Sequence, residues 1–139
     1  MAVDTLSAGV IVVRRHLSDW LFLMLEAYGY WDFPKGIVEE GEIPIDTAIR
    51  EVEEETTIKD LNFKWGDIYK DSRPYRGGRK VARYFIAVTE TEHVELPVSP
   101  ELGHPEHDSF AWLTYEDASK LVADRVAPIL DWANSIIRK

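Results

Sequence analysis

The chain has 139 residues, a formal net charge of −9 and no cysteine. With 45% hydrophobic residues it is not an intrinsically disordered chain, and its length predicts one domain spanning residues 1–139. The absence of cysteine rules out disulfides and thiolate zinc sites. The negative charge argues against a stable nucleic-acid partner held through its phosphate backbone. Because there is no membrane-length apolar run, and Asp4 precedes the first short one, we expect a cytoplasmic protein without a membrane partner.

The first half of the chain predicts two strands followed by a helix. Residues 7–14 are almost continuously apolar and β-branched, which is typical of a strand buried on both faces. A turn separates them from a second expected strand at residues 20–26. After Pro34 and Gly36 comes an acidic segment, and we expect a helix over residues 45–57 within it.

The second half predicts strands at residues 61–69, 81–89 and 109–113. Residues 71–80 form a predicted basic loop, and residues 90–107 form a long polar connection. Thr114 is expected to cap a helix that begins near Tyr115, and a last helix is expected over residues 127–138. This order of elements indicates an α/β fold with a mixed sheet between helical layers.

The acidic helix predicts a cluster of carboxylates on one side. At 100° per residue, Glu51, Glu54 and Glu55 project together, with Thr47 beside them. The opposite side is expected to carry Ile45, Ala48, Ile49, Val52 and Thr56. Like charges at this spacing repel, and a divalent cation over them would relieve the repulsion. The alternative interpretation is an ordinary solvated helix face.

The segment from Gly36 to Ile58 fits the pattern G-x5-E-x7-R-E-U-x-E-E-x-G-U, where U is apolar. The matching positions are Gly36, Glu42, Arg50, Glu51, Val52, Glu54, Glu55 and Ile58. The chain therefore resembles the Nudix hydrolases. The resemblance implies the Nudix fold, an α/β/α sandwich, and metal-dependent hydrolysis of a nucleoside diphosphate linked to another group. Thr57 replaces the second glycine, which would end the helix in a left-handed conformation that β-branched residues disfavour.

The same resemblance implies a role for each acidic residue. Glu54 and Glu55 correspond to the main metal ligands, and Glu51 to a ligand or to the group that orients the attacking water. The carbonyl of Lys35 corresponds to a further ligand. Arg50 is expected to position the carboxylates through an ion pair with Glu42 rather than to contact phosphate. Because oxygen ligands dominate, Mg²⁺ or Mn²⁺ is the expected cofactor.

The long connection offers two more candidates. Glu106 corresponds to a glutamate that completes the metal site or activates water in this family. His107 is a candidate phosphate contact, and its alternative interpretation is a surface loop residue.

A basic and aromatic segment is the candidate for substrate binding. Tyr75 suits stacking on a base, and the cations near it suit phosphate oxygens; these are Arg76, Arg79 and Lys80. Together with YWDFPKG and PEHDSFAWL, this segment resembles the asymmetric diadenosine tetraphosphate hydrolases. Lys35 then becomes a candidate phosphate contact as well. Trp31 is either a platform for adenine or a packing residue, and Tyr84 is either a core residue or a pocket wall.

The leading hypothesis is a Nudix pyrophosphohydrolase that converts diadenosine tetraphosphate to ATP and AMP. An RNA 5′-pyrophosphohydrolase, or an enzyme acting on other nucleoside triphosphates or on diphosphoinositol polyphosphates, remains an alternative. A non-catalytic nucleotide-sensing domain is an alternative of another class. The expected partner is a small nucleotide, and either a monomer or a homodimer is compatible with the sequence.

Overall fold

The computed structural model describes residues 4–139, and within this range one mixed sheet forms the centre of the fold. β1 (Thr5–His16) runs parallel to β6 (Lys80–Val88) and antiparallel to β2 (Asp19–Ala27). The shorter strands are β3 (Tyr30–Asp32), β4 (Lys35–Ile37), β5 (Tyr69–Asp71) and β7 (Ser109–Leu113). The order along the sheet is β3-β2-β1-β6-β5, with β4 paired to β1 and β7 paired to β2.

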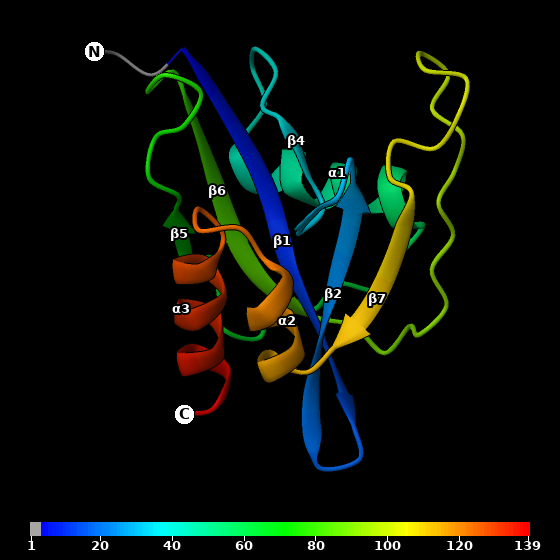
Figure 1. Ribbon diagram of the computed structural model, residues 1–139, viewed down its shortest axis with the longest axis vertical. Coiled ribbons are helices and arrows are strands. Elements are labelled where there is room, and N and C mark those ends of the chain that lie inside the picture. Colours follow the sequence, from blue (N-terminus) through cyan, green and yellow to red (C-terminus); the bar gives the residue numbers. More distant parts are fainter. Residues whose placement is uncertain (1–3) are drawn as a thin grey trace.

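β1 separates two hydrophobic cores because its side chains alternate between the faces of the sheet. Val10 and Val12 pack on the side of helix α1 (Pro44–Thr56), together with Val52 of that helix. Ile11 and Val13 pack on the other side, against helices α2 (Tyr115–Leu121) and α3 (Ala127–Ile137). Figure 1 shows α1 on one side of the sheet and α2 and α3 on the other. The predicted α/β/α architecture is therefore confirmed.

Helix ends follow the local sequence. Pro44 begins α1, and Thr114 caps α2 by accepting a hydrogen bond from the N–H of Asp117 at 3.2 Å, as predicted. Thr57 follows α1 with φ of 66°, and its N–H donates to the carbonyl of Glu53. The left-handed exit that the signature glycine would provide is therefore present despite the β-branched residue.

The predicted strand over residues 61–69 is wrong. Only Asn62 pairs there, through an isolated bridge to Val88, and β5 begins at Tyr69. Gly66 has φ of 83°, so the chain turns before a ladder can form. The strand was predicted from Phe63, Trp65 and Ile68, and of these Trp65 packs edge-on against Trp20.

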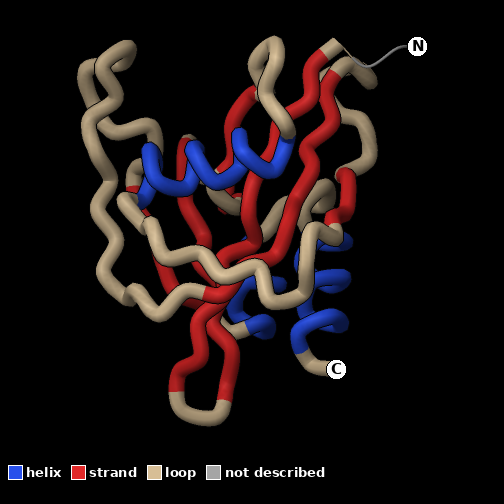
Figure 2. The backbone as a smooth tube through the Cα atoms, turned by 180° about the vertical axis from the view of Figure 1, so that it is seen from behind, coloured by secondary structure: helices blue, strands red, loops and turns tan. Residues whose placement is uncertain are grey.

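One further expectation on α1 needs correction. Ile49 was expected on the buried side but is 40% exposed, because it lies at the edge of the apolar stripe. Thr47, which was expected beside the carboxylates, is fully buried, and its hydroxyl donates to Glu42 at 2.9 Å. The long connection after β6 does lack regular structure, and Figure 2 shows it looping beside α1. No helix among residues 4–139 is long and apolar enough to cross a membrane.

Candidate active site

A cleft of about 1180 Å³ lies over the carboxylate side of α1. Two of its walls come from α1 and from the segment between β2 and β4. The other walls come from three connections: the basic loop before β6, the long connection before β7 and the connection between α2 and α3. The cleft thus collects side chains from segments that are far apart in the sequence. This volume is somewhat larger than that of a typical small-molecule site, about 300–1,000 Å³.

The three predicted carboxylates of α1 all line this cleft: Glu51, Glu54 and Glu55. Glu51 lies directly against the backbone of Gly36. A β-carbon at Gly36 would fall 2.0 Å from the carboxylate carbon of Glu51, so only glycine allows this approach. The signature glycine therefore has a steric role beside the acidic helix.

Arg50 holds the α1 carboxylates in place. Its Nε and Nη2 donate to the two oxygens of Glu42, each at 3.0 Å, which is the predicted ion pair in bidentate form. Its Nη1 donates to Glu51 at 3.1 Å and to Glu54 at 3.2 Å. The guanidinium lowers the pKa of the Glu42 carboxyl to about 2. Arg50 thus neutralises part of the charge of the helix and orients two of its carboxylates.

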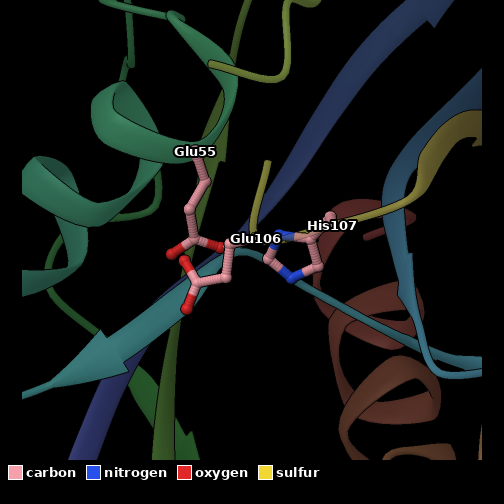
Figure 3. Close-up of side chains that lie close together, drawn as sticks. All are labelled: Glu55, Glu106 and His107. Carbon is pink, nitrogen blue, oxygen red and sulfur yellow. Dashed lines mark ion pairs between the residues drawn. The ribbon is translucent and has the colours of Figure 1, made fainter. Parts of the chain in front are cut away.

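Glu55, Glu106 and His107 meet inside the cleft (Figure 3). Each offers one possible ligand atom, and these atoms lie within 4.8 Å of one another. The carboxylate of Glu55 is buried, and within residues 4–139 neither of its oxygens has a hydrogen-bond partner. Burial raises the pKa of Glu55 well above its usual range, and the carboxylates of Glu51 and Glu106 raise it further. Glu106 and His107, the two candidates in the long connection, therefore lie adjacent to α1.

Glu106 and His107 are also shifted by their surroundings. Burial, followed by the charge of Glu51, raises the pKa of the Glu106 carboxyl. Burial, followed by the charge of Lys35, lowers the pKa of the His107 imidazole. His107 is therefore predominantly neutral at pH 7, and one ring nitrogen can donate a hydrogen bond while the other accepts one.

This donor set fits a hard divalent cation. The buried carboxylate of Glu55, which has no hydrogen-bond partner within residues 4–139, is unfavourable, and the carboxylate of Glu106 beside it adds repulsion. A cation that takes oxygen ligands would satisfy both conditions at once. Glu51, Glu54, Glu55 and Glu106 supply such oxygens at one end of the cleft.

The predicted substrate residues divide into two groups. Those that line the cleft are Trp31, Lys35, Tyr75, Arg76, Lys80 and His107. Arg79 is not brought to it, because its guanidinium turns to Asp4 at 2.6 Å. Tyr84 points into the core, fully buried, because it lies on the inward-facing register of β6. The ammonium group of Lys35 lies 3.6 Å from Asp32.

Asp32 and Arg125 also line the cleft and were missed by sequence reasoning. Arg125 donates to Asp32 at 2.8 Å and to the Tyr84 hydroxyl at 3.0 Å. Its guanidinium carbon lies 4.3 Å from the centre of the Tyr75 ring. A single arginine between two helices carries no motif, so only the three-dimensional structure reveals it. Asp32 could have been suspected from its place beside Trp31 and Lys35.

Comparison with known proteins agrees with this geometry. A family model described as NUDIX domain matches residues 3–133. The asymmetrical bis(5′-nucleosyl)-tetraphosphatase of Mus musculus is 32% identical over 126 residues, covering 83% of this chain and 82% of the relative. The RNA pyrophosphohydrolase of Bartonella bacilliformis is 26% identical over 137 residues, covering 82% and 79%.

Solved structures give the same result. The crystal structure of a C. elegans Ap4A hydrolase binary complex matches with a TM-score of 0.83 at 25% identity, covering 96% of this chain and 98% of that one. The chain therefore belongs to the Nudix family and is a Nudix pyrophosphohydrolase, with asymmetrical bis(5′-nucleosyl)-tetraphosphatases among its relatives.

Proposed function

We propose that this protein hydrolyses dinucleoside polyphosphates, with diadenosine tetraphosphate giving ATP and AMP. One observation carries the proposal: a single cleft joins the carboxylate cluster of α1 to a wall that contains Tyr75, Arg76 and Lys80. The carboxylate end suits metal-assisted cleavage of a phosphoanhydride, and the other end suits a base and its phosphates. A substrate with a long polyphosphate chain would extend between the two ends.

Metal ligation is assigned to Glu51, Glu54, Glu55 and Glu106, with the carbonyl of Lys35 as a further ligand. The expected ion, Mg²⁺ or Mn²⁺, neutralises phosphate oxygens and lowers the pKa of water when it is bound. Arg50 keeps Glu51 and Glu54 in fixed orientations through the hydrogen bonds of its Nη1. This preorganisation reduces the rearrangement needed when negative charge develops on the phosphates.

Proton transfer from water is assigned to Glu106. Its carboxylate lies beside Glu55 in the cleft, next to the proposed metal position. Glu51 is the second candidate for orienting this water. His107, which is neutral at pH 7, can donate a hydrogen bond to a phosphate oxygen.

Substrate binding is assigned to the basic and aromatic residues of the cleft. Tyr75 offers an aromatic surface for a base, while Lys35, Arg76 and Lys80 supply positive charge for the phosphate chain. Trp31 is a second aromatic wall of the cleft. The relatives named as tetraphosphatases and as an Ap4A hydrolase support this substrate class.

RNA with a 5′-triphosphate is the second candidate substrate, and the similarity to RNA pyrophosphohydrolases favours it. The net charge of −9 opposes binding of a long RNA backbone, whereas a dinucleotide requires only the cleft. The test is to measure kcat/KM with Mg²⁺ for diadenosine tetraphosphate, ATP and a 5′-triphosphorylated oligonucleotide. The proposal predicts the highest value for the dinucleotide, and a higher value for the oligonucleotide would contradict it.

A further inference from the structure

Arg125 reaches the cleft from the connection between α2 and α3. A backbone bridge between Trp31 and Val122 ties the beginning of this connection to β3. That tie brings Arg125 next to Asp32, which is the last residue of β3. The position of the arginine is therefore set by the sheet.

The guanidinium of Arg125 is fixed from two sides. Nη2 donates to Asp32 at 2.8 Å and Nη1 donates to the Tyr84 hydroxyl at 3.0 Å, while that hydroxyl donates to Asp32 at 2.9 Å. The Arg125 and Asp32 side chains are only 19% and 16% exposed. Because Tyr84 is a core residue, this closed triangle anchors the guanidinium to the interior of the protein.

The free surface of the anchored guanidinium faces Tyr75. The 4.3 Å separation between its central carbon and the ring centre is a cation–π contact. The backbone of Tyr75 is held separately, by a bridge to Lys80 across a turn in which Arg76, Gly77 and Gly78 have positive φ. Arg125 thus immobilises the ring of a residue whose backbone the turn already fixes.

We propose that Arg125 is the positioning residue for nucleobase recognition: it covers one face of Tyr75 and leaves only the other face for the base of the substrate. The inference rests on the proposed function, in which Tyr75 stacks on a base. Each Nη atom of Arg125 makes one of these hydrogen bonds, to Tyr84 or to Asp32, and the guanidinium carbon lies over the Tyr75 ring, so the proposed effect on the substrate passes through Tyr75. A ring held in advance loses less conformational freedom when a base binds.

The test is a double-mutant cycle on binding. A non-hydrolysable methylene-bridged analogue of diadenosine tetraphosphate is titrated, with Mg²⁺, into wild type, Arg125→Gln, Tyr75→Ala and the double variant. We expect each single substitution to raise Kd about tenfold, and the double variant to bind no more weakly than Tyr75→Ala. This non-additivity distinguishes positioning of the ring from a general loss of structure. With diadenosine tetraphosphate as substrate, Arg125→Gln should raise KM and leave kcat within about twofold.

Two further variants keep the test decisive if Arg125→Gln folds poorly. Arg125→Lys retains a charge for Asp32 but loses the planar stacking group, so it should restore stability without restoring Kd. Arg83→Gln is the matched control, because Arg83 also pairs with an aspartate, Asp71 at 2.8 Å, and stacks on a tyrosine, Tyr69 at 4.0 Å. This second set does not line the cleft, so Kd should stay at the wild-type value.

The outcomes separate the inference from the function on which it rests. A raised Kd for Tyr75→Ala with a wild-type Kd for Arg125→Lys and Arg125→Gln would overturn the inference alone. Additive effects in the double variant would also overturn it, because Arg125 would then act independently of the ring. An unchanged Kd for Tyr75→Ala, or no binding by wild type, would overturn the proposed substrate and the inference together.

Discussion

The Oε1 atom of Glu55 lies 3.5 Å from the Nδ1 atom of His107, although neither Glu55 oxygen has a hydrogen-bond partner within residues 4–139. Glu55 comes from α1 and His107 from the connection that precedes β7. Folding therefore buries a carboxylate beside other acidic groups without satisfying it. Such an arrangement is unfavourable for stability and is expected where a cation binds.

Glu55→Gln is predicted to stabilise the metal-free protein. The amide removes a buried negative charge and can donate to the neighbouring carboxylates, so the free energy of unfolding in a chelator should rise by about 1 kcal/mol. The substitution should also abolish the increase in Tm that Mg²⁺ gives to wild type. Thermal unfolding with and without Mg²⁺ measures both effects. The control is Glu53→Gln, on the exposed side of α1, and a Glu55→Gln variant that still responds to Mg²⁺ would contradict the assignment.

Glu54→Gln is predicted to impair catalysis rather than folding. Glu54 lines the cleft but is exposed, so its loss should leave Tm close to that of wild type. Removing a metal ligand should lower kcat by about 100-fold and raise the Mg²⁺ concentration needed for half-maximal rate. Initial rates over a Mg²⁺ titration test this. Wild-type rates for Glu54→Gln would remove Glu54 from the metal site.

The ion pair between Arg50 and Glu42 predicts a defined dependence of stability on pH. Arg50 holds the pKa of Glu42 at about 2, below its ordinary value of 4.5. This stabilisation is therefore complete above pH 4.5 and is lost as the pH falls toward 2. Tm measured between pH 6 and pH 3 should fall less in Glu42→Gln than in wild type. Glu40→Gln, at an exposed neighbouring position, should keep the wild-type slope, and parallel curves for all three proteins would refute the prediction.

Thr57→Gly is predicted to stabilise the fold. Thr57 has φ of 66°, a conformation that glycine adopts without the penalty of a β-carbon. Replacement should raise the free energy of unfolding by about 1 kcal/mol, measured by urea denaturation. Thr57→Ala is the matched control, because it keeps the β-carbon and should gain less. A destabilised Thr57→Gly variant would show that the threonine side chain offsets the strain.

Hydrophobic patterns within single segments correctly predicted several of the strands and helices. A nearly continuous run of apolar, β-branched residues indicated β1. The helical spacing of Glu51, Glu54 and Glu55 predicted that these side chains lie on one side of α1. The strand predicted over residues 61–69 failed because Gly66 allows a turn, and β-propensity does not register a turn of that kind. The predicted burial of Ile49 was wrong, because the width of the buried side of a helix depends on which segments pack against it.

The site residues that lie outside α1 are brought together by contacts between segments that are distant in the sequence. Glu106 was identified only through a resemblance, and His107 only as a candidate phosphate contact. The closeness of both residues to Glu55 follows from the pairing of β7 with β2. No sequence pattern indicated Arg125, because its contacts are with residues on β3, on β6 and in the basic loop. Periodicity within a segment cannot show which segments will meet.

The most direct test of the central claim is the identity of the products. Diadenosine tetraphosphate is incubated with wild type and Mg²⁺, and the nucleotides are separated by anion-exchange chromatography, with Glu54→Gln as the inactive control. The account predicts equimolar ATP and AMP from wild type and a rate about 100-fold lower from the variant. Formation of ADP alone, or cleavage of 5′-triphosphorylated RNA with no cleavage of the dinucleotide, would contradict it.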